Sequence, residues 1–235
     1  MSSTDLVIRP ATPADAAAVA QVWSESRATA ADLMPASVHS DEQVAAHLAS
    51  RVGRGAVWLA ERNGAAVAML DLADGWLESL YVAPGHTGRG VGSALVDLAK
   101  SLEPGGFGLW VFESNSRARE FYRRHGLVEL ERTDGTGNEE EAPDIRMVWP
   151  GEEPLTYLRS LMDEVDHDLA GVIARRVALT HAIQRFKPVA GHAGRDAARE
   201  REIARKMAGH APVLEEAAWL RIMHEVIGAS LDRLD

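Results

Sequence analysis

The last part of the chain carries a long stripe of apolar residues at helical spacing, and two cations interrupt it. The members of the stripe are Met162, Val165, Leu169, Val172, Arg176, Thr180, Ile183 and Lys187. At about 100° per residue, all of them fall within roughly 40° of Arg176 on one helix face. A cation on a core-facing stripe needs a partner or a ligand, because an unpaired buried charge is costly. The stripe holds no acid, so it predicts either a buried anion site or an ion pair with another helix.

The helix that carries this stripe is predicted to run from near Pro154 to about Phe186, before Pro188. About 32 residues at 1.5 Å each give a length of roughly 48 Å. Such a helix cannot bury its whole stripe inside a unit of roughly 80 residues, so it needs a partner of similar length. We therefore expect a homodimer that forms through the C-terminal helices.

Two shorter helices are predicted after a loop that contains Gly191 and Gly194. Asp196 is expected to cap the first, which runs to about Ala208, and the second begins at Val213. The apolar stripe of this last helix is Leu220, Met223, Ile227, Ser230 and Leu234. The end of the chain is thus predicted to be an all-α domain of three helices.

The first half alternates between strand and helix patterns. Strands are predicted at residues 6–9, 56–60, 65–70, 76–82 and 109–112. Asn63 and Gly64 predict a hairpin turn between the second and third strands. Thr12 as N-cap and Pro13 after it are typical of a helix start. Because the alternation stops near the breakers of residues 150–154, we expect two domains, residues 1–150 and 151–235.

A glycine-rich loop follows the fourth predicted strand and precedes a helical run. Its residues are Gly88, Arg89, Gly90, Val91, Gly92 and Ser93. Glycines let backbone N–H groups approach a ligand, and the helix N-terminus adds a partial positive charge, so the loop can hold a pyrophosphate. The spacing matches neither the dinucleotide fingerprint nor the phosphate-loop motif, and a flexible turn is the alternative interpretation.

A second motif follows the strand at residues 109–112. It comprises Asn115, Ala118, Phe121, Tyr122, His125, Gly126 and Leu127. Together with the glycine loop it resembles the GNAT-type N-acetyltransferases, over about residues 5–149. The resemblance implies an α+β fold with a mixed, mostly antiparallel sheet and flanking helices. It also implies acetyl-CoA as co-substrate, held in a splay between two neighbouring strands.

The same resemblance assigns roles to residues of this chain. The pyrophosphate of acetyl-CoA would lie on Gly88 to Ser93, and the pantetheine arm on backbone groups near Leu80 and Val82. Asn115 would contact CoA, and Tyr122 would be the general acid that protonates the leaving thiolate. The base is open: Glu78 would act through water, or is an outward, solvated carboxylate. Where the family's loop commonly begins with Arg or Gln, this chain has Thr87.

The three C-terminal helices resemble the all-helical chorismate mutases over about residues 155–235. The residues that carry this resemblance are Leu158, Arg159, Arg175, Arg176, Lys187, Asp196, Arg199 and Glu200. It implies that the stripe cations bind the two carboxylates of chorismate, which would rearrange to prephenate without cofactor or metal. The implied context is chorismate metabolism and aromatic amino acid biosynthesis.

By that resemblance, Arg176 and Arg199 bind chorismate, and Lys187 donates to its ether oxygen. Asp196 and Glu200 would hold the substrate hydroxyl and the local arginines, and Ser230 would bind a carboxylate. Arg159 would serve the site of the other copy. It lies about 100° from the Arg176 face and roughly 25 Å along the same helix, which disfavours a shared pocket in one chain.

One departure leaves the activity of this second domain open. The family has Gln or Glu four residues after the serine, as a partner of the ether oxygen, and this chain has Leu234 there. Asp232 or Asp235 would substitute only after a register shift. Loss of such a donor costs on the order of 10²–10³ in rate. The alternatives are an isochorismate pyruvate-lyase, or a weak or inactive mutase-like domain that serves dimerisation and ligand sensing.

Composition adds exclusions to this bifunctional prediction. The chain has 235 residues, no cysteine and a net charge of −10, which disfavours thiolate chemistry and a nonspecific nucleic-acid binder. A signal-peptide pattern and a long apolar run are both missing, so we expect a cytoplasmic protein without membrane contact. The histidines show no metal-ligand spacing, so no metal is expected. The acidic balance would suit a cationic amine as acetyl acceptor.

Overall fold

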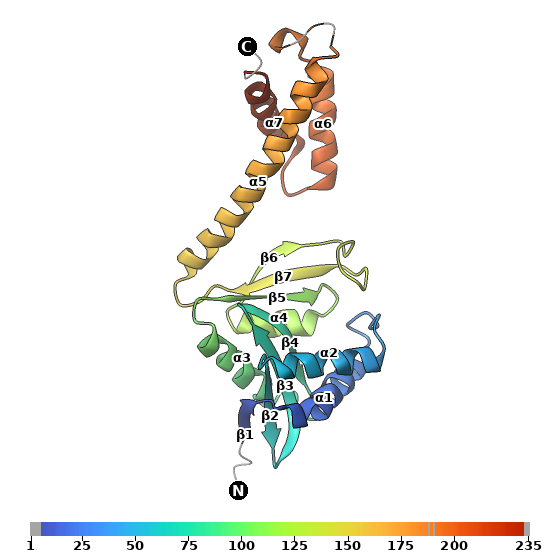
Figure 1. The fold of residues 1–235 in the computed structure, drawn as a ribbon, viewed down its shortest axis with the longest axis vertical. Coiled ribbons are helices and arrows are strands. Elements are labelled where there is room, and N and C mark those ends of the chain that lie inside the picture. The colour runs from blue at the N-terminus through green and yellow to red at the C-terminus, as the bar shows by residue number, and fades with distance from the viewer. Residues whose placement is uncertain (1–5, 188, 190, 233–235) are drawn as a thin grey trace. The chain divides into compact units, whose positions relative to one another are not determined.

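The computed structural model describes residues 6–187, 189 and 191–232 (Figure 1). It divides into two compact units, residues 1–159 and 160–235. The long helix α5 (Pro154–Gln184) begins in the first unit and continues into the second. The predicted domain boundary at residue 150 remains a prediction.

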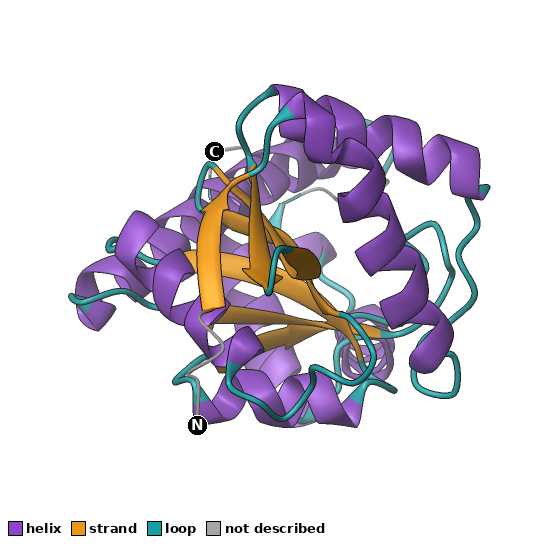
Figure 2. Cartoon of the chain, turned by 90° about the horizontal axis from the view of Figure 1, so that it is seen from below, coloured by secondary structure: helices purple, strands orange, loops and turns teal. Residues whose placement is uncertain are grey.

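The first unit is built on a mixed sheet of seven strands (Figure 2). In spatial order these are β1 (Leu6–Pro10), β2 (Val57–Arg62), β3 (Ala65–Ala73), β4 (Trp76–Val82), β5 (Phe107–Phe112), β7 (Asp144–Trp149) and β6 (Val128–Arg132). Every neighbouring pair is antiparallel except β4 and β5, which are parallel. The predicted mixed, mostly antiparallel sheet is thus confirmed.

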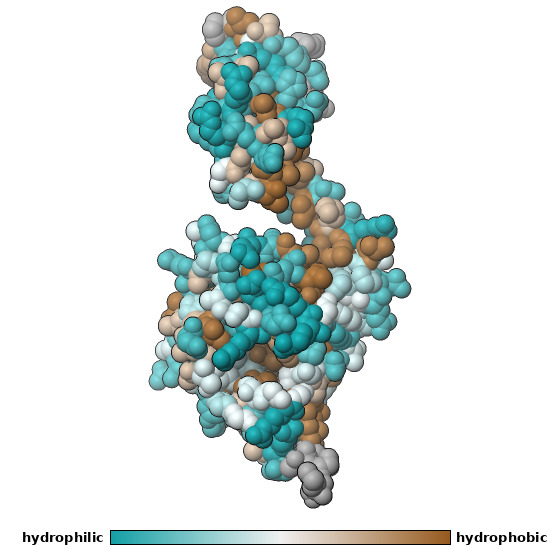
Figure 3. Space-filling view, turned by 180° about the vertical axis from the view of Figure 1, so that it is seen from behind, coloured by the Kyte–Doolittle hydropathy of each residue, from teal (hydrophilic) through white to brown (hydrophobic). Residues whose placement is uncertain are grey.

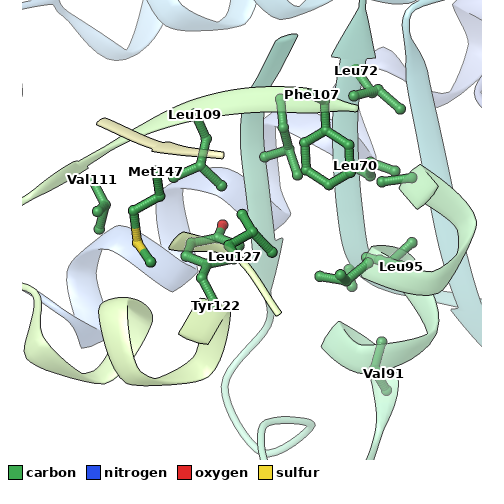
Figure 4. Packing of buried hydrophobic residues seen from close by; sticks show 14 of the residues in the cluster. Leu70, Leu72, Val91, Leu95, Phe107, Leu109, Val111, Tyr122, Leu127 and Met147 are labelled. Atoms are coloured by element: carbon green, nitrogen blue, oxygen red, sulfur yellow. The ribbon is translucent and has the colours of Figure 1, made fainter. Parts of the chain in front are cut away.

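Two pairs of helices enclose the sheet, each over its own apolar cluster. Helices α1 (Ala16–Thr29) and α2 (Asp41–Gly53) pack over a cluster that includes Val19, Leu48 and Met69. Helices α3 (Val91–Leu102) and α4 (Ser116–Arg124) contribute to the larger cluster of the other face. Figure 4 shows part of that cluster, in which α3 and α4 side chains meet those of β3, β5 and β7. Burial on both faces explains why the central strands are nearly continuous apolar runs.

The hairpin between β2 and β3 forms as its sequence predicts. Asn63 and Gly64 have φ values of 54° and 77°, the left-handed pair that a two-residue hairpin turn requires. Asn and Gly tolerate this conformation, which other residues disfavour.

A bulge in β4 interrupts its pairing with β3, and β4 pairs little with β5. Asp71 of β3 pairs with Ser79, but Leu72 pairs with Leu77, so Glu78 is an extra residue in β4. Beyond this point β4 pairs with β5 at a single position, Trp76 with Gly108. The two strands therefore diverge from that end, and the gap is the splay that the sequence resemblance implies.

The second unit contains the rest of α5, with α6 (Ala197–His210) and α7 (Glu216–Leu231), which pack against each other. The predicted extent of α5 and the start of α6 after Asp196 are confirmed within two residues. The predicted start of the last helix at Val213 is wrong, because residues 212–214 form a turn and the helix begins at Glu216. Trp219 Nε1 donates to the carbonyl of Ala211 and ties this turn to the first turn of α7.

The apolar stripe of α5 is exposed in the single chain (brown in Figure 3). No described residue of α5 is buried, and Met162, Val165 and Leu169 are 60%, 61% and 51% exposed. The stripe is therefore not covered within its own chain, as the length of the helix led us to expect, and the homodimer stays a prediction. Among the described helices, none combines the length and the apolar character that a membrane crossing requires.

Candidate active sites

A cavity of about 960 Å³ lies at the end of β4 in the first unit. Four segments line it: the end of α1 with the loop after it, the end of β4, the glycine-rich loop and the first turns of α4. The lining residues used below are Ser26, Thr29, Ala30, Leu33, Met34, Leu80, Tyr81, Val82, Gly88, Gly90, Gly92, Ser93, Asn115, Arg117, Glu120, Phe121 and Arg124.

The glycine-rich loop ends in an uncapped helix N-terminus at the cavity. Gly88 and Gly90 have φ values of 69° and 81°, a conformation that needs glycine at these two places. Gly90 is the N-cap of α3, and no described side chain bonds to the first amides of that helix. A Cβ at Gly92 would lie 3.3 Å from the ring of Phe121. The loop thus presents free N–H groups and a helix dipole, the requirements for an anion.

Ser93 in this loop is tied to the end of α4. Its hydroxyl is hydrogen-bonded to Nε2 of His125 at 3.1 Å, and the His125 ring meets Phe121 edge to face at 4.5 Å. Burial lowers the pKa of His125, and the positive charges of Lys100 and Arg124 act in the same direction. An anion at the loop would oppose that shift, because it favours the charged imidazole.

Asn115 shapes the start of α4 at the rim of the cavity. Its side-chain oxygen accepts from the N–H of Ala118 at 3.1 Å, so it is the N-cap of this helix. The N-cap hydrogen bond does not use the two N–H donors of the same amide group, so they can donate to a ligand.

The cavity brings together most of the residues predicted to bind acetyl-CoA. Leu80, Val82, Gly88, Gly90, Gly92, Ser93 and Asn115 line it. Val91 is instead buried in the apolar cluster at 1% exposure, and the side chain of Arg89 is exposed. Glu78 is exposed at the β4 bulge and is not one of the lining residues.

Tyr122 lies in the apolar cluster beside the cavity, among Val111, Leu127 and Met147 (Figure 4). Burial raises its pKa well above the usual range, so the phenol is protonated at neutral pH. It is not among the lining residues, whereas Tyr81 of β4 is.

Sequence reasoning missed the wall contributed by α1 and the cations of α4. The α1 segment supplies Ser26, Thr29, Ala30, Leu33 and Met34, and α4 supplies Arg117 and Arg124. Neither set has a motif of its own. The one available signal was Ser26, a polar residue at helical spacing from the apolar Val19 and Val22.

In the second unit, Arg176 is a half-buried cation with one unsatisfied guanidinium nitrogen. Its Nη1 atom is buried and makes no hydrogen bond with any described residue. Burial lowers its pKa, and the charge of Glu200 opposes that effect. A half-buried guanidinium with one unsatisfied buried N–H group favours an anionic ligand, because an unpaired buried donor is costly.

Glu200 is already held by two residues that the sequence did not single out. Arg195 donates to both of its carboxylate oxygens, each at 2.8 Å, and also to Nδ1 of His224 at 2.8 Å. The hydrogen bonds from Arg195 lower the pKa of Glu200, so the carboxylate is ionised. Only the fold brings these three side chains together, since His224 lies on α7 and Glu200 on α6.

The other predicted mutase residues make local contacts in the single chain. Lys187 Nζ donates to the carbonyl of Gly194 at 2.8 Å, and Asp196 accepts from two amides as the N-cap of α6. Arg199 pairs with Glu202 at 2.6 Å on the surface, and the buried Ser230 hydroxyl donates to the Val226 carbonyl at 2.5 Å.

Some of the predicted positions stand apart from this group. Arg159 is exposed on α5, and Asp232 Oδ1 accepts a hydrogen bond from His192 Nε2 at 2.7 Å. A hollow of about 490 Å³ in this unit is lined by Leu220, Arg221, His224 and Glu225, none of them a predicted site residue. Leu234 and Asp235 lie outside the described residues. Within the described ranges no group of three His, Asp or Glu side chains is placed to hold a metal.

Two family models match the chain, one in each part. Residues 53–129 match the acetyltransferase (GNAT) domain, and residues 158–233 match chorismate mutase type II. Comparison with curated proteins gave no match.

Solved structures share the fold of the first unit. YjaB from Escherichia coli is 22% identical, with a TM-score of 0.53, and covers 63% of this chain and 99% of its own. A GCN5-related N-acetyltransferase from Rhodopseudomonas palustris is 25% identical, with a TM-score of 0.51, over 64% of this chain and 98% of its own. Ard1 from Thermoplasma volcanium is 18% identical, with a TM-score of 0.51, over 62% and 97%.

Proposed function

We propose that this chain, which joins a GNAT acetyltransferase domain to a chorismate mutase type II domain, transfers acetyl groups from acetyl-CoA to an amine and converts chorismate to prephenate. Both family models describe enzymes. The observation that carries the first activity is the strand splay that ends at an uncapped helix N-terminus. The observation that carries the second is the half-buried guanidinium of Arg176, whose buried Nη1 makes no hydrogen bond with any described residue.

For acetyl transfer, different segments that line the cavity would bind different parts of acetyl-CoA. The amides at the start of α3 bind the pyrophosphate, because they point at the cavity with the positive end of the helix dipole. The β4 edge that faces the splay offers backbone groups at Leu80 and Val82 to the pantetheine amides. Acetyl-CoA supplies the acetyl group, and the fit is supported by the left-handed glycines Gly88 and Gly90 among the lining residues of the cavity.

The chemical step moves the acetyl group from sulfur to nitrogen. The acceptor amine attacks the thioester carbonyl, the carbon–sulfur bond breaks, and the thiolate takes a proton. Tyr122 is the proposed donor, since its raised pKa keeps the phenol protonated at neutral pH. Glu78 is the proposed base and would act through a water molecule, because its side chain is exposed outside the cavity lining.

For the mutase reaction, catalysis would come from positioning and charge alone. Arg176 and Arg199 bind the carboxylates, and Lys187 donates to the ether oxygen as the C–O bond breaks. Glu200, kept ionised by Arg195, accepts from the substrate hydroxyl together with Asp196, and Ser230 turns toward a carboxylate. The pericyclic step needs no proton transfer, cofactor or metal.

This second site would be completed by another copy of the chain. The exposed stripe of α5 offers a long apolar face that a copy of the same helix can cover. Pairing would bring Arg159 of the partner subunit to the site of Arg176. The proposal is thus a homodimer through α5, with two equivalent mutase sites.

A second candidate is a ligand-sensing domain that binds chorismate without converting it, or a lyase that acts on isochorismate. Local pairing of Arg199 with Glu202 and of Ser230 with its own helix favours this candidate. Leu234 at the usual Gln or Glu position points the same way.

Both activities are tested with the full-length purified protein. Release of CoA from acetyl-CoA in the presence of amines reports the first, and prephenate absorbance reports the second. We expect both, and each ligand should raise the melting temperature by mass action. Chorismate binding without prephenate would select the sensing or lyase alternative, and loss of any acetyl-CoA effect would refute the transferase.

A further inference from the structure

Two chemically different sets of residues line the cavity of the first unit. One set consists of the amides of the glycine-rich loop and the guanidinium groups of Arg117 and Arg124 from α4. This set suits the phosphates of acetyl-CoA, so the acceptor is left with the other set, the α1 end of the lining, where the end of α1 and its following loop form a wall.

The wall at the α1 end carries no charged side chain among the described lining residues. It consists of Ser26, Thr29, Ala30, Leu33 and Met34, with Tyr81 from β4 beside them. Tyr81 also packs edge to face on Trp23 at 6.1 Å, which extends the apolar surface behind the wall. The nearby cation Arg27 is engaged elsewhere, because it donates to the Pro35 carbonyl at 2.8 Å and lies over the Trp23 ring.

Glu120 is the one carboxylate among the described lining residues, and it already has partners. It accepts from Arg123 at 3.4 Å and lies 3.6 Å from Arg124. If an acceptor carried a second ammonium group, that group would lose its hydration in the cavity. It would find no unpaired carboxylate among the described lining residues to replace the water. Burying an unpaired cation is costly, so this cavity disfavours polycations.

Ser26 adds a hydrogen-bonding position to this apolar wall. The residue is 9% exposed, and its Oγ is buried without a hydrogen-bond partner in the described part of the chain. An unsatisfied buried hydroxyl destabilises the free protein slightly, and a polar atom of a ligand would remove that cost.

We infer that the acetyl acceptor is a primary amine on an apolar body, uncharged apart from the reacting nitrogen, with Ser26 as a specificity-determining residue. This inference rests on the proposed acetyl transfer. It also reverses the expectation drawn from the net charge of −10, because the acids of the chain do not line the acceptor end.

The first test compares acceptors with the full-length protein and acetyl-CoA. Release of CoA is measured with 2-phenylethylamine and hexylamine, and with spermidine and kanamycin. We expect kcat/KM at least tenfold higher for the first pair. A preference for spermidine or kanamycin would overturn the inference and leave the transferase intact.

If turnover is low, measurements of ligand binding distinguish a failure of the inference from a failure of the proposed acetyl transfer. The melting temperature is measured with CoA alone, and then with CoA and each amine. A shift with CoA but none with either apolar amine would overturn the inference. No shift with CoA would instead refute the proposed function at its first step.

Two variants test whether residues of the α1 wall determine the preference for the acceptor. Ser26→Ala should raise KM for the preferred amine about tenfold, while KM for acetyl-CoA stays unchanged. Ser24→Ala, on an exposed face of the same helix, is the matched control. Met34→Asp supplies the missing carboxylate and should shift the preference toward spermidine. If Ser26→Ala and Ser24→Ala changed KM for the amine equally, Ser26 would not be a specificity-determining residue.

Discussion

The candidate sites of the two units differ in how far a single chain assembles them. In the first unit, the end of α1, the end of β4, the glycine-rich loop and the start of α4 of one chain already line a cavity of about 960 Å³. In the second unit, the predicted residues make local contacts, and the apolar face of α5 is exposed. A site made by sheet topology is complete within one chain, whereas a site made on a long helix needs whatever covers that helix.

The largest expected effect concerns the unpaired cation of the second unit. Arg176→Ala should lower prephenate formation by roughly 10²–10³-fold, because it removes the half-buried charge proposed to bind a substrate carboxylate. Prephenate absorbance measures the loss, and acetyl transfer should not change. Arg175→Ala, an exposed neighbour on the same helix, is the control. Undiminished turnover in Arg176→Ala would refute the assignment of the mutase site.

The next effect concerns the acid of the first unit. Tyr122→Phe should lower acetyl transfer by about 10²-fold, because the thiolate loses its proton donor. Acetyl-CoA affinity, measured by calorimetry, should stay nearly constant, since Tyr122 lies beside the cavity lining. Tyr81→Phe is the informative comparison, because Tyr81 does line the cavity. If the loss follows Tyr81 instead, the acid lies on β4 and the family assignment of Tyr122 is wrong.

The smallest effect is a pH dependence at the glycine-rich loop. The pKa of His125 in the folded protein is below its ordinary value of 6.5, so the unfolded chain binds more protons between these two values. The stabilisation is complete above pH 6.5 and is lost as pH falls toward the folded pKa. His125→Gln should flatten the melting temperature across this interval.

The control for this pH effect is His47→Gln, which changes an exposed histidine on α2 of the same unit. Saturating acetyl-CoA should weaken the dependence in the unaltered protein, because the pyrophosphate favours the charged imidazole. An identical pH profile in the two variants would show that His125 does not act in this way.

Local signals in the sequence predicted much of the first unit and the helices of the second. Asn63 and Gly64 determine a turn through their own backbone preferences, and Asp196 caps α6 through amides two and three residues away. The glycine-rich loop is equally local, since Gly88 and Gly90 take left-handed conformations that other residues avoid. These features depend on neighbours in sequence, which a pattern can reveal.

The parts that escaped prediction depend on distant residues. The acceptor wall joins the end of α1 to β4, and the grouping of Arg195, Glu200 and His224 joins α6 to α7. Strand β6 (Val128–Arg132) is exposed along its length, so it lacks the alternating apolar pattern that marks a half-buried strand. The exposed stripe of α5 is a third case, because the pattern predicts burial without stating in which chain.

The most direct test of the comparison is complementation between two defective copies. Arg159→Ala and Arg176→Ala are purified separately, each expected to form little prephenate, and are then mixed and allowed to exchange subunits. If each mutase site combines Arg176 with Arg159 of the partner subunit, half of the dimers gain one intact site, and about a quarter of the activity returns. No recovery in a mixture that exchanges subunits would contradict a site shared between two copies.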